Sequence, residues 1–209
     1  MRIIAGTARR KALETLPGDE ITRPTGERVK EGLFSAIQFE CEGRRVLDLF
    51  CGSGQLALEA LSRGADSAVM IDDNVAAVEI IKTNAKNTGL MKQCRVSRMD
   101  YSEYLKSASA KGEKFDLVFL DPPYAKDVKD EVLKKVTRAD ILSPGAIVVC
   151  ESDADRFAED EEVYGLHFRR KYRYGRVYIT MLEMPEKEEE PSESEKQNTE
   201  ARHTGDSKE

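Results

Sequence analysis

The chain has 209 residues, of which 40% are hydrophobic, and a formal net charge of -6 at pH 7. This length and composition fit one soluble catalytic domain, and they exclude a membrane protein because no run approaches the roughly 20 apolar residues of a membrane helix. Residues 184–209 carry -5 of the net charge, so residues 1–183 are close to neutral and their local basic clusters can still bind a nucleic acid.

The four cysteines are widely spaced, at positions 41, 51, 94 and 150. With no C-x-x-C pair and only two histidines to join them, they predict neither a zinc site nor a disulfide framework. We interpret them as reduced thiols, and because the N-terminus lacks an apolar signal segment we expect a cytoplasmic protein without a metal. Residues 184–209 have almost no apolar side chain to bury, which predicts a disordered tail.

Residues 1–44 precede the predicted sheet and carry two basic groups. A turn with three adjacent positive charges follows an apolar start, and it either lies in solvent or contacts phosphates. Pro24 then favours extended geometry at the residue before it, and Thr25 is positioned to cap a helix over 26–39 that leaves Lys30 and Glu31 exposed. The candidate phosphate contacts of this segment are Arg9, Arg10, Lys11, Arg23 and Arg28.

An apolar strand that starts at Arg45 ends in a glycine-rich turn. Gly52 and Gly54 allow the tight turn and the close backbone approach that a bound nucleotide needs. Asp48 lies within the strand, and a buried carboxylate is costly unless it is paired, so it predicts a cationic or hydrogen-bonding partner at the strand's carboxyl end. A helix over 56–63 follows and ends at a glycine.

The same turn also fits the template of dinucleotide-binding proteins. Gly52, Gly54 and Ala57 satisfy G-x-G-x-x-A, and Asp72 lies 20 residues after Gly52. An NAD-dependent oxidoreductase is therefore an alternative at this point, as is a plain strand-to-helix turn.

Strand and helix patterns alternate from residue 67 to residue 150. The expected strands cover 67–71, 94–99, 115–120 and 146–150, the expected helices cover 74–88, 101–110 and 128–136, and a turn is expected at 143–145. This alternation predicts an α/β fold with a parallel, doubly wound sheet that binds ligands at the carboxyl ends of its strands. Carboxylates end or follow four strands, at Asp48, Asp72, Asp100 and Asp121.

Two further strands, 166–173 and 177–182, are separated by too few residues for a crossover helix. We therefore expect an antiparallel hairpin. Five of the eight residues from 169 to 176 are basic, and they form either a charged edge strand in solvent or a phosphate-binding surface that includes Arg170 and Arg173.

The sequence Asp-Pro-Pro-Tyr at 121–124 decides between the nucleotide-binding classes. After a fourth strand, it resembles the motif of S-adenosylmethionine-dependent amino-group methyltransferases. From residue 1 to about 183 the chain resembles the bacterial 16S ribosomal RNA guanine-N2 methyltransferase family, the RsmD type. The resemblance is carried by Met1-Arg-Ile-Ile-Ala-Gly, Thr22-Arg-Pro-Thr, Arg28-Val-Lys-Glu-Gly-Leu-Phe, Asp48-Leu-Phe-Cys-Gly-Ser-Gly, Leu58-Glu-Ala-Leu-Ser-Arg-Gly-Ala and Asp121-Pro-Pro-Tyr.

This resemblance implies a Rossmann-like class I methyltransferase fold of seven strands, mostly parallel, with an antiparallel C-terminal hairpin strand. It divides the chain into an N-terminal preface (1–44), a catalytic domain (45–183) and a tail (184–209). It implies S-adenosylmethionine as cofactor and S-adenosylhomocysteine as product. The implied substrate is the N2 amine of guanine 966 in 16S rRNA, either free or in the assembling small subunit. We expect a monomer that does not bind membranes.

The resemblance also implies roles for the strand-end carboxylates. Asp48 would hold the ammonium of the methionine end, Asp72 the ribose hydroxyls and Asp100 the adenine amino group. Cys51 stands where the family usually has alanine, and we interpret it as a small neutral substitute. Asp72-Asp-Asn replaces an expected glutamate and basic residue, which shortens the ribose contact. The full implied cofactor set is Asp48, Phe50, Cys51, Gly52, Ser53, Gly54, Asp72, Met99 and Asp100.

Methyl transfer to an exocyclic amine needs activation, because the nitrogen lone pair is delocalised into the ring. The Asp121 carboxylate and the Pro122 carbonyl can accept hydrogen bonds from the amine and align it. Pro123 would stiffen the loop, and Tyr124 would stack on a base that has left its helix or loop. We expect the basic groups at both ends of the chain to surround this pocket, with the preface over the carboxyl ends of the strands.

The motif leaves the methylated group open, since adenine-N6 and glutamine methyltransferases share it. A non-catalytic ribosome-assembly factor is a further alternative, although nothing in the sequence indicates a damaged site. The oxidoreductase alternative offers no task for residues 121–124.

Overall fold

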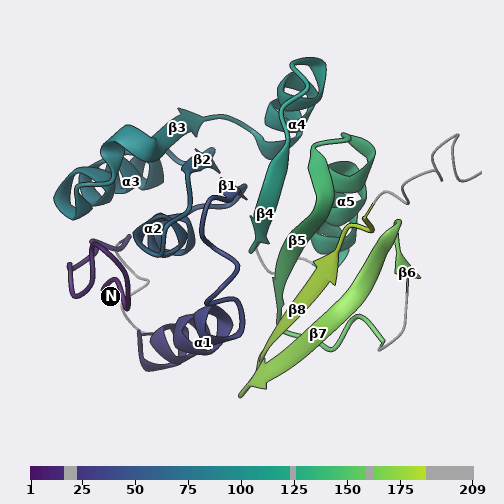
Figure 1. Cartoon of the computed structure of the whole chain (residues 1–209), viewed down its shortest axis with the longest axis horizontal. Coiled ribbons are helices and arrows are strands. Elements are labelled where there is room, and N and C mark those ends of the chain that lie inside the picture. Colours follow the sequence, from purple (N-terminus) through teal and green to yellow (C-terminus); the bar gives the residue numbers. More distant parts are fainter. Residues whose placement is uncertain (17–22, 123–125, 159–161, 187–209) are drawn as a thin grey trace, which may run out of the picture.

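A computed structural model describes residues 1–16, 23–122, 126–158 and 162–186. These residues form an eight-stranded sheet with helices on both faces (Figure 1). The helices are α1 (Arg23–Ala36), α2 (Gln55–Ser62), α3 (Val75–Thr88), the short η2 (Met91–Gln93), α4 (Tyr101–Ala110) and α5 (Lys126–Arg138). The strands are β1 (Arg45–Asp48), β2 (Ser67–Asp72), β3 (Cys94–Arg98), β4 (Phe115–Leu120), β5 (Leu142–Ser152), β6 (Glu162–Val163), β7 (Leu166–Tyr174) and β8 (Val177–Glu183).

The strand order β3-β2-β1-β4-β5-β8-β7-β6 confirms the predicted doubly wound topology. Strands β1 to β5 are parallel, and β8 pairs antiparallel with both β5 and β7. The expected C-terminal hairpin is therefore present. The sheet has one strand more than the expected seven, because β6 pairs with β7 over two residues at the edge.

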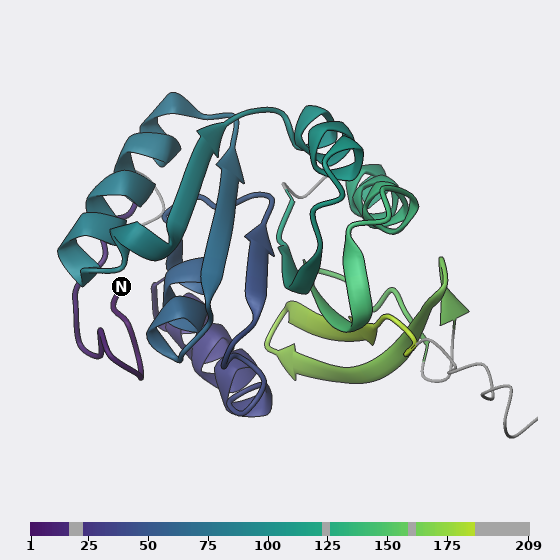
Figure 2. The same cartoon turned by 45° about the horizontal axis from the view of Figure 1, so that its top comes forward.

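Helices cover both faces of the sheet (Figure 2), and an apolar core lies on each face. One core joins α1, α2, α3 and the N-terminal segment to the sheet, and the other joins α4 and α5 to it. Buried residues alternate along each central strand between these cores, as expected for a sheet covered on both faces. No helix in the described ranges has the length and apolar character needed to cross a membrane.

Two expected boundaries are wrong. Helix α1 begins at Arg23, so Thr25 lies inside the helix and not at the N-cap position. A proline is tolerated there because the N–H groups of the first turn have no intrahelical acceptor. The expected turn at 143–145 is part of β5, because the register with β4 shifts between Phe115 and Leu117 and the extra residues bulge out.

Lys30 was expected to be exposed, but only 1% of it is accessible. Its ammonium donates a hydrogen bond to the Arg2 carbonyl at 2.7 Å and lies 3.8 Å from the carboxylate of Glu59, which is fully buried. Glu59 in turn accepts the backbone N–H groups of Ile4 at 2.8 Å and Ala5 at 3.0 Å. The N-terminal segment therefore covers a face of α1 that looks polar in the sequence.

Candidate functional site

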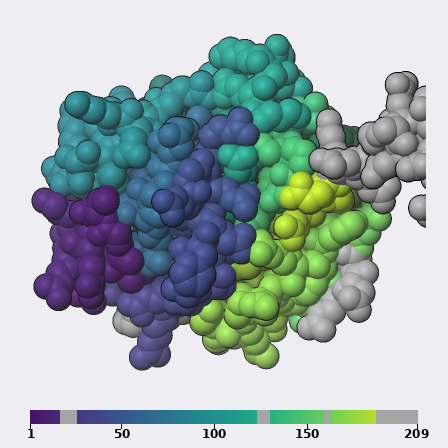
Figure 3. Space-filling view, viewed as in Figure 1, coloured from purple at the N-terminus to yellow at the C-terminus, as the bar shows by residue number. Residues whose placement is uncertain are grey.

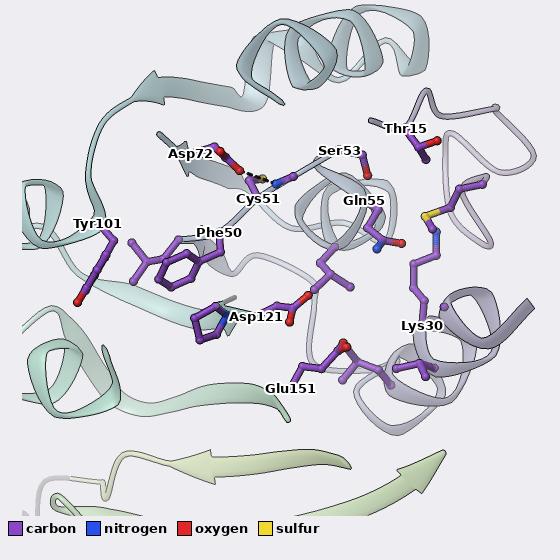
Figure 4. A pocket seen from close by; sticks show the side chains of 18 of the residues that line it. Thr15, Lys30, Phe50, Cys51, Ser53, Gln55, Asp72, Tyr101, Asp121 and Glu151 are labelled. Carbon is purple, nitrogen blue, oxygen red and sulfur yellow. Dashed lines mark hydrogen bonds between the residues drawn. The ribbon is translucent and has the colours of Figure 1, made fainter. Parts of the chain in front are cut away.

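A cavity of about 840 Å³ lies at the carboxyl ends of the parallel strands, where the strand order reverses between β1 and β4 (Figure 4). All five parallel strands contribute to its wall, and α1 closes one side. The predicted site residues on this wall are Phe50, Cys51, Gly52, Ser53, Asp72, Met99, Asp100, Asp121 and Pro122. Asp48 and Gly54 are buried next to it. Pro123 and Tyr124 lie outside the described residues.

Asp48 is a buried carboxylate beside the cavity, with 2% of its surface accessible. It accepts hydrogen bonds from the Cys51 thiol and the Phe50 backbone N–H. Burial raises the pKa of Asp48 to about 7, and the nearby charges of Asp121 and Asp72 contribute to the increase. The ionised form of Asp48 is thus costly here, and a cation in the cavity would favour it.

Cys51 has a role that the sequence did not reveal. Burial, followed by the neighbouring Asp48 carboxylate, raises the pKa of its thiol well above the ordinary value. The thiol therefore remains protonated near neutral pH and acts as the donor to Asp48. An alanine at this position could not make this bond.

The glycine turn presents bare backbone to the cavity. Gly52 and Gly54 have φ angles of 54° and 78°, which other residues rarely adopt. A Cβ placed on Gly52 would meet no atom within 4 Å, so the wall of the cavity is open at this point. Gly54 then leads into α2, with its N–H donating to the Cys51 carbonyl at 2.7 Å.

Asp72 and Asp100 both orient the loops that follow their strands. One carboxylate oxygen of Asp72 accepts the Gly52 N–H at 2.8 Å, and the other accepts the Asn74 N–H at 2.9 Å. Asp100 caps α4 by accepting the N–H groups of Ser102 at 2.8 Å and Glu103 at 3.2 Å. Each carboxylate oxygen has more than one lone pair, so these bonds leave room for a ligand.

The catalytic candidates Asp121 and Pro122 follow β4 directly and lie on the cavity wall. Figure 4 shows Asp121 close to the middle of the wall, below Phe50. Its negative charge is one of the causes that raise the pKa of Asp48. The cofactor candidates and the amine-aligning candidates therefore share one cavity.

The residues on the wall that were not predicted include Lys30, Gln55, Tyr101, Glu151 and Val177. Glu151 had the same signal as the four recognised carboxylates, because it lies at the end of a parallel strand. Tyr101 packs its ring on Phe50, with 5.3 Å between centroids. The side-chain oxygen of Gln55 is buried and has no hydrogen-bond partner among the described residues, so it can accept a ligand's donor.

The three cations of the basic turn (Arg9, Arg10 and Lys11) are exposed but lie away from the cavity. The turn is fixed to Ser62, the last residue of α2, which accepts the N–H groups of Thr7 at 2.8 Å and Ala8 at 2.9 Å. The first residue of α2 lines the cavity, and eight helical residues span about 12 Å. The expectation that the preface covers the strand ends holds for α1, Met1 and Thr15, but not for this turn.

The hairpin tip (Tyr174–Val177), in contrast, lies at the cavity. Val177 is on the cavity wall, and Tyr174 packs so closely on Gly32 of α1 that an added Cβ would come within 1.9 Å of its hydroxyl. Arg170 and Arg173 are exposed on the neighbouring strand. In Figure 3 the purple N-terminal segment lies at the left and the light-green hairpin at the lower centre and right, so the two basic groups form separate surfaces. Arg28 is exposed on α1, and the Arg23 side chain is outside the described residues.

Within the described ranges, no group of three His, Cys, Asp or Glu residues could hold a metal ion.

The sequence of residues 1–183 matches the family model "Conserved hypothetical protein 95". The chain belongs to this family, the RsmD type. The putative rRNA methyltransferase YlbH of Bacillus subtilis is 36% identical over 176 residues, which cover 84% of this chain and 94% of that protein.

The chain is also similar to ribosomal RNA small subunit methyltransferase D of Haemophilus influenzae, at 32% identity over 75% of this chain and 80% of that protein. Among solved structures, the putative methyltransferase yhhF from Escherichia coli has a TM-score of 0.75 at 28% identity and covers 90% of this chain and 99% of its own. These likenesses confirm the predicted class I methyltransferase fold and set the oxidoreductase alternative aside.

Proposed function

We propose that this protein is an S-adenosylmethionine-dependent methyltransferase that methylates N2 of a guanine in 16S rRNA, guanine 966 by the family resemblance. The observation that carries the proposal is the meeting of the Asp48 glycine turn and Asp121-Pro122 in one cavity. The names of the chain's relatives, which include ribosomal RNA small subunit methyltransferase D, support rRNA as the substrate.

The cavity suits the proposed cofactor. Buried Asp48 favours a cationic partner, which the ammonium of the methionine end supplies. The bare backbone at Gly52, the carboxylates of Asp72 and Asp100 and the unpaired Gln55 oxygen offer acceptors and space for the rest of the molecule. When bound, the cofactor supplies an electrophilic methyl group on a sulfonium.

The chain's own contribution to the reaction is to orient the amine and to remove its proton. Hydrogen bonds from the amine to the Asp121 carboxylate and the Pro122 carbonyl localise the nitrogen lone pair and aim it. As the nitrogen gains a methyl group it loses one proton, which passes to Asp121 or to water.

Arg28, Arg170 and Arg173 are proposed to contact the RNA backbone near the cavity, with Arg9, Arg10, Lys11 and Arg23 as more distant or undescribed candidates. Such contacts position the RNA, while the target base enters the cavity.

The test is to compare modified nucleosides in small-subunit RNA from a strain with and without the gene, and then to incubate the purified protein with S-adenosylmethionine and the RNA from the deletion strain. We expect one N2-methylguanosine to disappear in the strain and to be restored by the protein. The appearance of N6-methyladenosine would identify the adenine alternative, and binding without methylation would identify an assembly factor.

A further inference from the structure

Glu151 occupies the position on β5 that corresponds to Asp121 on β4. The parallel register pairs Leu120 with Cys150, so Asp121 and Glu151 are the next residues on neighbouring strands. Strands in a sheet are roughly 4.8 Å apart. Both residues are half-buried and line the cavity, and Figure 4 shows their carboxylates directed into the same space.

The two carboxylates also face the same side of the sheet. On β4 and β5, every second residue belongs to the core that includes α1, and Asp121 and Glu151 extend those two rows by one step. Helix α1 packs on this face of the sheet and contributes Val29, Lys30 and Leu33 to the cavity lining, and Val177 lies beside β5 on the neighbouring strand β8. The result is a slot with two adjacent acceptors at the ends of β4 and β5, lined also by apolar side chains from α1 and β8.

This arrangement matches the donor pattern of one base. The Watson–Crick edge of guanine presents the N1–H and the N2 amino group side by side, so it offers neighbouring donors to neighbouring carboxylates. Adenine has an unprotonated N1, whose lone pair a carboxylate would repel. The apolar walls suit the faces of a flat purine.

We propose that Glu151 accepts the N1–H of the target guanine while Asp121 and Pro122 hold its N2 amino group, so that Glu151 is a residue that determines specificity for guanine. This inference rests on the proposed function. It assigns the discrimination between guanine and adenine to a side chain outside residues 121–124, the sequence that adenine and guanine enzymes share. Leaving a buried partner without its hydrogen bond is the means by which polar sites reject an analogue.

The test uses 2-aminopurine, which keeps the amino group at C2 but has no hydrogen on N1. Small-subunit RNA with guanine or 2-aminopurine at the target position is made by ligating synthetic fragments, and kcat/KM for methylation is measured for each RNA. We expect the wild-type protein to prefer guanine by about 10- to 100-fold. Glu151→Gln, which can donate to an unprotonated N1, should reduce this preference at least about tenfold.

Glu131→Gln, an exposed position on α5, is the matched control and should keep the wild-type preference. A wild-type protein that methylates both RNAs equally would refute the role of Glu151 without any variant. An equal loss on both RNAs in Glu151→Gln would show a structural role and would also contradict the inference. If the wild-type protein methylates neither RNA, the proposed function itself has failed.

Discussion

The charge state of Asp48 links the cavity to the stability of the fold. Burial raises its pKa from 3.8 to about 7. A carboxyl group whose pKa is higher in the folded than in the unfolded protein contributes to the stability of the fold. This contribution is complete below the pKa of the unfolded state, and it is lost as the pH rises through the folded-state pKa of about 7. Above that pH the free protein holds a buried carboxylate, and a cationic ligand would neutralise its charge.

Asp48→Asn should therefore raise the melting temperature of the free protein near pH 8 by at least about 3 °C. The amide stays neutral and can still bond to the Phe50 N–H. The gain should vanish below about pH 4, where the wild-type carboxyl is protonated in both states. Calorimetry at both pH values measures this difference in melting temperature.

S-adenosylhomocysteine should raise the melting temperature of the wild type more than that of the variant. Equal increases in the two proteins would argue against an ammonium contact at Asp48.

Asp121→Ala should lower the rate of methyl transfer at least about 100-fold, because a preorganised acceptor for the amine is lost. Cofactor affinity should change little, since the Gly52 turn and Asp72 remain in place. Single-turnover kinetics and calorimetric titration with S-adenosylhomocysteine measure the two effects separately. Near-normal turnover in the variant would remove Asp121 from the mechanism.

Helix α2 holds the N-terminal segment through one buried carboxylate. Glu59 bonds to two backbone N–H groups of that segment and pairs with Lys30 and Arg63. Glu59→Ala should destabilise the protein by about 3–5 kcal/mol, because it removes the counter-charge of buried Lys30 and leaves two backbone donors without their acceptor. Urea unfolding measures the loss, and trypsin should cleave the basic turn faster. Glu31→Ala, on the exposed side of α1, should change neither result.

The hairpin and the basic turn can be compared at equal charge. Arg170→Glu with Arg173→Glu should raise the KM for RNA at least about tenfold and flatten its salt dependence, because the hairpin tip lies at the cavity. Arg9→Glu with Arg10→Glu makes the same change in charge at the far end of α2 and should have a smaller effect. If the second pair has the larger effect, the RNA extends along α2 instead.

The predicted disordered tail, residues 184–209, falls largely outside the described residues, which end at Glu186. Met184 belongs to the folded part, because it exchanges backbone hydrogen bonds with Gly145 at 3.0 Å and Ala146 at 2.8 Å. Removing residues 187–209 should leave the melting temperature and the methylation rate nearly unchanged, since that segment is too polar to bury a core. A fall of more than about 5 °C would show that the segment packs on the fold.

Apart from η2 and the two-residue strand β6, the sequence by itself determined the type and order of the elements from β1 to β8, with most ends within two residues. The reason is that hydrophobic periodicity, glycine turns and helix caps are local properties that a short window contains. The carboxylates at the strand ends and residues 121–124 could be recognised in the same way. Glu151 carried the same signal and was overlooked.

Only the tertiary structure decided which polar groups are buried and where the basic groups lie. Lys30 is inaccessible because residues 1–5, remote in sequence, cover it. Cys51 donates to Asp48 because the turn folds back on its strand. The basic turn lies at the far end of α2, whereas the hairpin tip packs on α1. These contacts join segments far apart in the chain, so long-range packing determines them and no local pattern encodes them.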